Sequence, residues 1–100
     1  MTVTFYTRDG EPTDLDGFCR IVESGETVVE QTEIGTQVMV STMFLGIDHS
    51  LGTPPPILFE TMIFGGPHSY EHTRYATEAE ARAGHARVVA AVRADMGMPS

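Results

Sequence analysis

Two apolar runs, separated by a proline-rich segment, dominate the hydrophobic pattern of this chain. In residues 37–47 the apolar side chains fall on both alternating faces: one face carries Val38, Val40 and Phe44, and the other carries Met39, Met43, Leu45 and Ile47. Residues 57–64 repeat this two-sided character, interrupted only by Glu60. The pattern is typical of strands covered on both faces, so it predicts two central strands buried on both sides.

Two weaker strand patterns precede the first run. Residues 3–7 alternate apolar and polar positions, which predicts a short strand at an edge of the sheet. Residues 27–34 are rich in β-branched side chains, and we expect Val28, Thr32 and Ile34 to face the core. Because Glu30 falls on that same face, this strand is expected to lie at the rim of the sheet or to be irregular there.

The first helix is predicted between Thr13 and Gly25. Thr13 is the expected N-cap, and carboxylates in the first turn suit the helix dipole. The apolar positions that follow helical spacing are Leu15, Phe18, Cys19 and Val22.

The C-terminal helix has the clearest local signals. Thr77 and Glu80 form a capping box, and Glu78 with Arg82 forms a helical ion pair in the favoured orientation. Gly84 suggests a close approach of the helix backbone to the sheet. The expected buried stripe is Ala81, His85, Val88, Val89, Val92 and Met96, and residues 97–100 are expected to form a frayed tail.

These elements predict one α+β domain over residues 1–100. Its order is β-α-β-β-β-α, with an antiparallel sheet of three to four strands and the C-terminal helix packed on it in two layers. Between the central strands, Pro54, Pro55 and Pro56 predict a stiff surface loop.

The composition narrows the classes of partner. The 100 residues carry a formal net charge of −8 and no lysine. Because phosphate-backbone binding needs clustered Lys or Arg, we expect no direct nucleic-acid ligand, whereas a basic protein surface would be attracted. The simpler explanation, which we favour over a basic partner, is that the acidity keeps a small domain soluble. We expect neither a membrane span nor a signal peptide, and therefore a cytoplasmic protein. The single cysteine, Cys19, excludes an intrachain disulfide, and no cofactor is expected.

The candidate catalytic residues are Asp48, His49, Glu60 and His85. Asp48 and His49 follow one central strand and Glu60 lies in the other, so the three could meet at one end of the sheet and act as a general base or bind a cation. The alternatives are structural: Asp48 accepts loop hydrogen bonds, Glu60 pairs with Arg74, and His85 is a satisfied core histidine. No nucleophile-elbow motif, metalloprotease motif or phosphate loop accompanies them.

The candidate binding residues are Tyr70, Arg74 and Tyr75, because tyrosine and arginine are enriched among the energetic anchors of interfaces. Exposed tyrosines beside Arg74 would suit a protein-binding module. The alternative for Tyr75 is that it closes the core beneath the C-terminal helix. His68 and His72 have the spacing of helical metal ligands, but Pro67 argues against a helix there.

Several segments together resemble a group of small uncharacterised proteins encoded by bacteriophages and prophages of high-GC Gram-positive bacteria. The resemblance covers most of the chain and implies a phage accessory protein, but no specific activity. The segments that carry it are 5–10, 40–49, 58–66, 74–75, 80–81 and 84–85. The first helix departs from the group near Cys19, where an aromatic residue is usual.

From these observations we expect a non-catalytic module that binds a host protein or assembles with itself. The alternative is a small enzyme or metal-binding protein using Asp48, His49 and Glu60. A structural role in the virion stays open as a third possibility.

Overall fold

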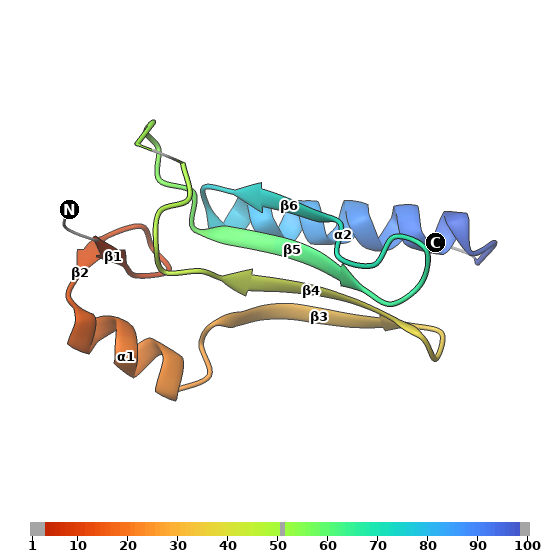
Figure 1. Cartoon of the computed structure of the whole chain (residues 1–100), viewed down its shortest axis with the longest axis horizontal. Helices are drawn as coiled ribbons and strands as arrows, with labels where there is room; N and C mark the ends of the chain where they lie inside the picture. The colour runs from red at the N-terminus through yellow and green to blue at the C-terminus, as the bar shows by residue number, and fades with distance from the viewer. Residues whose placement is uncertain (1–3, 51, 99–100) are drawn as a thin grey trace.

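The computed structural model describes residues 4–50 and 52–98 and confirms the predicted α+β class (Figure 1). Val3 and the last two residues of the expected frayed tail lie outside the described residues. The elements in chain order are β1 (Phe5–Tyr6), β2 (Pro12–Thr13), α1 (Leu15–Glu23), β3 (Val28–Ile34), β4 (Val38–Phe44), β5 (Phe59–Phe64), β6 (His72–Tyr75) and α2 (Glu78–Asp95).

The main sheet is an antiparallel meander with strand order β3-β4-β5-β6. Its fourth strand, β6, comes from a segment in which the sequence analysis identified no strand. The first strand is not part of this sheet, because β1 pairs with β2 in a separate two-stranded sheet.

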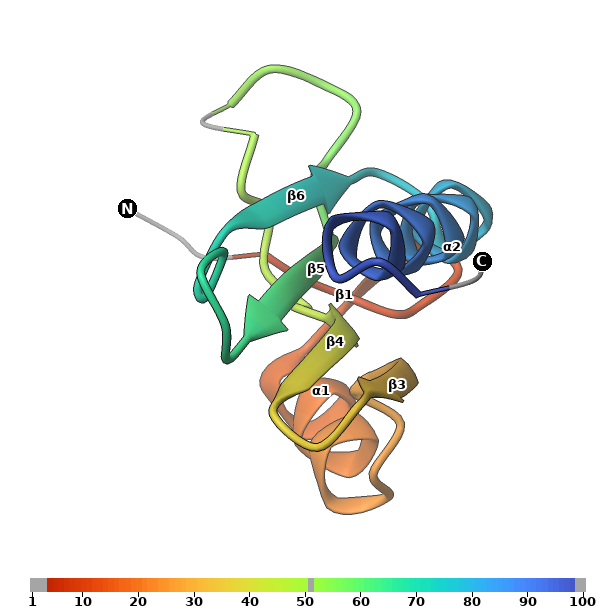
Figure 2. The same cartoon turned by 90° about the vertical axis from the view of Figure 1, so that its right-hand side faces the viewer.

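The core lies between one face of the main sheet and α2 (Figure 2). It has two clusters of buried side chains. One contains Ile34, Val38, Val40, Ile63, Val89 and Val92, and the other contains Phe44, Leu58, Phe59, Tyr75 and Ala81. Every second residue of the two central strands therefore points toward the helix.

Helix α2 begins as predicted. The Glu80 amide donates to Thr77 Oγ1 at 3.2 Å, and the Glu78–Arg82 ion pair spans 3.0 Å. Gly84 is buried, and a Cβ atom at this position would collide with the Tyr75 ring, which confirms the close approach of helix and sheet. Met96 departs from the predicted stripe, because it follows the last helical residue and remains exposed.

Two expectations for α1 are wrong. Its N-cap is Asp14, whose side chain accepts from the Gly17 amide at 2.8 Å, because Thr13 belongs to β2. Cys19 is exposed rather than buried, and so are Leu15 and Val22. The helix packs through Phe18, as predicted, and through Ile21, which the predicted stripe did not contain; both are half-buried.

Strand β3 is an edge strand with an irregularity at Val28 and Glu30, as the misplaced charge at Glu30 predicted. The irregularity turns Val28 away from the core, so the expectation that Val28 faces inward is wrong. Val28 pairs with Met43 and is 41% exposed.

The N-terminal segment closes one end of the main sheet. The Tyr6 amide donates to the Gly46 carbonyl at 2.9 Å, and the ring of Phe18 lies where a side chain at residue 46 would stand. Arg8 fastens this segment to α2 through a hydrogen bond of 2.9 Å from its Nε to Glu78 Oε1. In the described ranges, neither helix combines the length and the apolar character that a membrane crossing requires.

Candidate functional site

The central strands are covered on one side only, contrary to the two-sided burial that their sequences predict. Directly paired residues of antiparallel strands share a face of the sheet. Opposite α2, β4 and β5 carry the pairs Met39–Phe64, Ser41–Met62 and Met43–Glu60. In Figures 1 and 2, neither described helix lies over this side of the sheet.

We call this surface the open face. The register extends it onto both edge strands: Gln31 lies beside Ser41, Glu33 beside Met39, and His72 beside Met62. Its middle is therefore mostly apolar, although Ser41 there is only 2% exposed, and its two rims are polar except at Val28 of β3. Its members are Val28, Gln31, Glu33, Met39, Ser41, Met43, Glu60, Met62, Phe64, His72 and Arg74.

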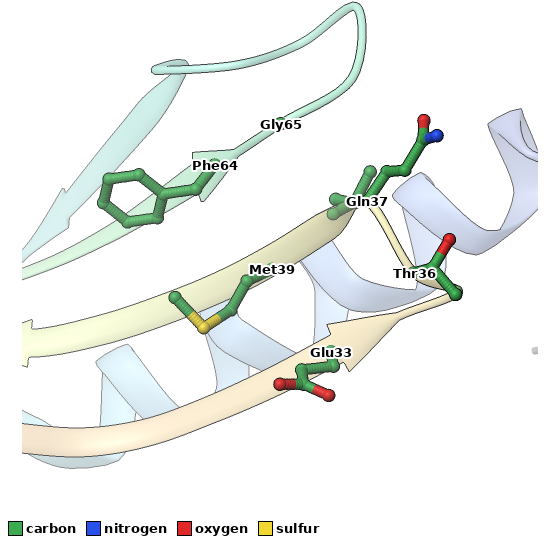
Figure 3. A pocket seen from close by; sticks show the side chains of 8 residues that line it. Glu33, Thr36, Gln37, Met39, Phe64 and Gly65 are labelled. Carbon is green, nitrogen blue, oxygen red and sulfur yellow. The ribbon is translucent and has the colours of Figure 1, made fainter.

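Two hollows lie along the open face and share Phe64. The larger, of about 560 Å³, is at the β3–β4 turn, where Glu33, Met39 and Phe64 stand on the near side of the sheet with α2 behind it (Figure 3). The second, of about 250 Å³, lies farther along the sheet and is bordered by Phe18 of α1. Met43 and Phe64 line it while remaining 36% and 37% exposed.

Tyr70 stands at one end of this surface and is 70% exposed. Its ring meets Phe64 edge-on, with the ring centroids 6.1 Å apart. Its backbone has φ 72°, a left-handed conformation that is uncommon for a bulky residue, and its amide donates to the Ile63 carbonyl at 2.6 Å. The β5–β6 loop thus presents an aromatic side chain beside the open face, where the sequence placed a binding residue.

Arg74 and Glu60 neutralise each other on the open face. Arg74 Nε donates to Glu60 Oε2 at 2.9 Å across the β5–β6 pair. This is the structural ion pair that the sequence analysis weighed against a catalytic Glu60. It leaves the middle of the face without an unpaired charge.

Tyr75, the third candidate binding residue, is in the core. It is only 8% exposed and packs against Gly84 of α2, so the expectation of an exposed side chain is wrong. Adjacent strand residues point to opposite faces, and Tyr75 therefore points away from Arg74. The alternative weighed for Tyr75, closure of the core beneath α2, describes its position.

The structure does not gather Asp48, His49 and Glu60 into one site. Asp48 accepts hydrogen bonds from the amides of Ser50 and Ile57 and from the Ser50 hydroxyl, at 2.7 to 2.8 Å. The Ile57 amide, followed by both Ser50 groups, lowers the pKa of Asp48. His49 is exposed, and Glu60 pairs with Arg74. Across the described residues, no three or more His, Cys, Asp or Glu side chains come together as a metal-binding group.

His85 lies in a buried polar network between the sheet and α2. Its Nδ1 is 2.7 Å from Thr42 Oγ1 and its Nε2 is 2.8 Å from Thr32 Oγ1. Burial lowers the pKa of His85 and favours the neutral ring, although Glu30 at 3.8 Å raises it. Both ring nitrogens are therefore occupied by threonine hydroxyls, as the structural alternative for His85 requires.

One charged cluster had no sequence signal. His68 Nδ1 bonds Glu71, and His68 Nε2 lies 3.1 Å from Asp95 of α2. Glu71 and then Asp95 raise the pKa of His68. Asp95 is far from His68 in the sequence, so only the tertiary structure joins them. The cluster fastens the β5–β6 loop to the C-terminal end of α2.

In comparisons with protein-family models, with curated proteins and with solved structures, nothing matched this chain. The open face, which the geometry alone identifies, is the candidate functional site.

Proposed function

We propose that this chain is a small non-catalytic module that binds a protein through the open face of its sheet. In keeping with the phage-protein resemblance, we place it among accessory proteins that act in the cytoplasm of an infected host cell. A single observation supports the proposal. The sequences of β4 and β5 are apolar on both faces, but the fold covers only one face of these strands.

Covering this face would release free energy. Burial of a Met or Phe side chain is worth about 1.5–3 kcal/mol relative to full exposure, and Met39, Met43, Met62 and Phe64 still have exposed surface to lose. Contiguous apolar patches of this kind commonly mark sites of protein interaction.

The residue types also suit a protein surface as ligand. Methionine is flexible and polarisable, so it adapts to an irregular partner surface, and aromatic residues such as Phe64 and Tyr70 are enriched in interfaces. Polar side chains on the two rims complete the usual arrangement of an apolar centre with a polar border.

The catalytic alternative receives no comparable support. The oxygens of Asp48 accept loop hydrogen bonds, and Glu60 pairs with Arg74. Ile57, whose amide bonds Asp48, precedes Glu60 by three residues, which is about 10 Å of extended chain. His85 is 1% exposed, and both of its ring nitrogens bond threonine hydroxyls of the sheet, from Thr32 and Thr42.

The test is protein capture with a matched pair of variants. A tagged chain is expressed together with an untagged copy in a high-GC Gram-positive host, and retained proteins are identified by mass spectrometry. Met62→Lys places a charge in the middle of the open face. Ala83→Lys adds the same charge on an exposed position of α2.

The expected result is a stoichiometric partner, a host protein or the untagged copy, that the wild type and Ala83→Lys retain and Met62→Lys loses. Retention of nothing by any chain, or equal retention by all three, would overturn the proposal. Far-UV circular dichroism and a cooperative melt establish that Met62→Lys is folded. Phe64→Lys, at a more exposed position of the same face, is the second variant.

A further inference from the structure

We infer that the protein bound on the open face is a second copy of this chain, packed face to face about a two-fold axis parallel to the strands. This inference rests on the proposed function and deepens it by naming the partner. It follows from how the side chains of the open face are ordered across the sheet.

The register arranges the open face in three rows that run from β3 to β6. The first row is Glu33, Met39 and Phe64, with Tyr70 beyond Phe64. The second row is Gln31, Ser41, Met62 and His72. The third row is Val28, Met43, Glu60 and Arg74.

The two rims are chemically complementary. The β3 rim offers a carboxylate and an amide, from Glu33 and Gln31. The opposite rim offers an imidazole and a phenol, from His72 and Tyr70, whereas its guanidinium, Arg74, is already paired with Glu60 and shares a row with Val28. A surface that carries acceptors on one rim and donors on the other is complementary to a rotated copy of itself.

A two-fold axis parallel to the strands brings the acceptor rim of each copy against the donor rim of the other. It places each β3 over the partner's β6 and each β4 over the partner's β5. Met39 then lies over the partner's Phe64, Gln31 over the partner's His72, and Glu33 within reach of the partner's Tyr70 hydroxyl. A two-fold axis across the strands would instead stack β3 on β3 and set like rims against each other.

The open face also has little net charge. The chain carries a formal charge of −8, whereas the open face holds the paired Glu60 and Arg74 together with Glu33. Two acidic copies would therefore repel each other less through this surface than through the N-terminal segment, where Asp9, Glu11, Asp14 and Asp16 outnumber Arg8. Both N-terminal segments lie at the same end of the dimer, so screening of their repulsion by salt is expected to tighten it.

The size of the face suggests a weak dimer. Four strands at about 4.8 Å spacing and seven residues at about 3.3 Å rise span roughly 19 Å by 23 Å. The flat area of the face is therefore about 440 Å², without the additional surface of protruding side chains. Standard interfaces bury about 800 Å² of accessible surface on each partner. We expect self-association at high micromolar concentration.

Sedimentation equilibrium of the purified full chain over micromolar to millimolar concentrations tests the inference. The wild type and Ala83→Lys should form dimers, and Met62→Lys should weaken the dimer at least tenfold. Phe64→Lys should do the same, which guards against misfolding of one variant. A monomer at every concentration, or a dimer insensitive to both open-face variants, would overturn the inference.

A charge swap distinguishes the two axes. Gln31→Lys and His72→Glu, combined in one chain, place an ammonium over the partner's introduced carboxylate if β3 lies over β6. The double variant should then dimerise more tightly than either single variant, by severalfold. If it dimerises more weakly than both, like rims are stacked and the proposed axis is wrong.

The two experiments distinguish failure of the self-association from failure of the proposed function. If the wild type stays monomeric but captures a host protein that Met62→Lys loses, the open face binds a different protein and only the self-association fails. If the wild type stays monomeric and captures nothing, both proposals fail.

Discussion

Thr42 of β4 and His85 of α2 are joined by a hydrogen bond of 2.7 Å between Thr42 Oγ1 and His85 Nδ1, in a part of the core where both residues are buried. Thr42 Oγ1 also bonds Thr61 Oγ1 on β5, and His85 Nε2 bonds Thr32 on β3. One imidazole therefore links the helix to three strands, and its protonation state affects the whole interface.

The contribution of His85 to stability should fall as the pH drops below about 6.5. Burial lowers the pKa of His85 in the folded chain, against the contribution of Glu30 on β3 and in the same direction as Arg82 on α2. The unfolded chain, with the ordinary histidine pKa of about 6.5, therefore takes up the proton first. The stabilisation is complete above that pH and is lost below it. Urea unfolding at pH 7.5 and pH 5 measures the difference.

His85→Gln is the control for this pH dependence, because its amide can still bond threonine hydroxyls but does not titrate in this range. The variant should be less stable than the wild type at pH 7.5 and should lose less stability between pH 7.5 and 5. An equal loss in both chains would assign the pH dependence to other groups.

His68 should titrate in the opposite sense. Its pKa is raised by Glu71 and, to a smaller extent, by Asp95. The folded chain therefore holds this proton more tightly, so the contribution to stability is present below about pH 6.5 and is lost as the pH rises through the folded pKa. Imidazole resonances followed by NMR should titrate above the ordinary value, and Glu71→Gln should lower this pKa more than Asp95→Asn does. If the pKa of His68 is unchanged in Glu71→Gln, Glu71 does not hold the proton on His68 as we expect.

Gly84→Ala should destabilise the chain, although alanine favours a helix over glycine by about 1 kcal/mol. The added methyl group would meet the Tyr75 ring, and overpacking of a core typically costs about 1–3 kcal/mol. Urea unfolding measures the loss. As a comparison, Ala83→Gly at an exposed position of the same helix should cost about 1 kcal/mol through helix propensity alone. A more stable Gly84→Ala would show that the helix can move away from the sheet.

Arg8→Ala should loosen the N-terminal segment from α2. Arg8 bonds Glu78 and also donates to the Glu26 carbonyl at 2.9 Å. Both charged side chains are partly buried, so we expect a loss of about 1–2 kcal/mol and faster limited proteolysis before residue 28. Arg82→Ala removes the other partner of Glu78, at a more exposed position within α2, and should cost about 0.3–0.5 kcal/mol. Equal proteolysis of the two variants would argue against the fastening role of Arg8.

The local signals that predicted elements correctly act between near neighbours in the chain. Thr77 and Glu80 start α2, Glu78 pairs with Arg82 one turn later, and the two apolar runs become β4 and β5. The first helix was placed correctly, but its cap was not, and of its predicted buried stripe only Phe18 packs on the core. Its short apolar pattern allowed several faces, and the contact of Phe18 with Gly46 selects one of them.

The candidate site was predicted only in fragments. Tyr70 and Arg74 lie beside or on the open face, whereas Tyr75, one residue after Arg74, points into the core because strand residues alternate. The methionines and Phe64 were recognised as apolar strand positions, but their exposure depends on which side α2 covers. No local sequence pattern determines which side of the sheet α2 covers.

The sequence by itself determined which segments form the central strands and the C-terminal helix, because hydrophobic periodicity and capping act over a few residues. It also marked β4 and β5 as apolar on both sides. Only the tertiary structure decided that one of those sides meets α2 while the other stays open, that His85 bonds Thr32 and Thr42, and that His68 meets Asp95. Each of these depends on contacts between residues distant in the chain, which register and helix packing bring together.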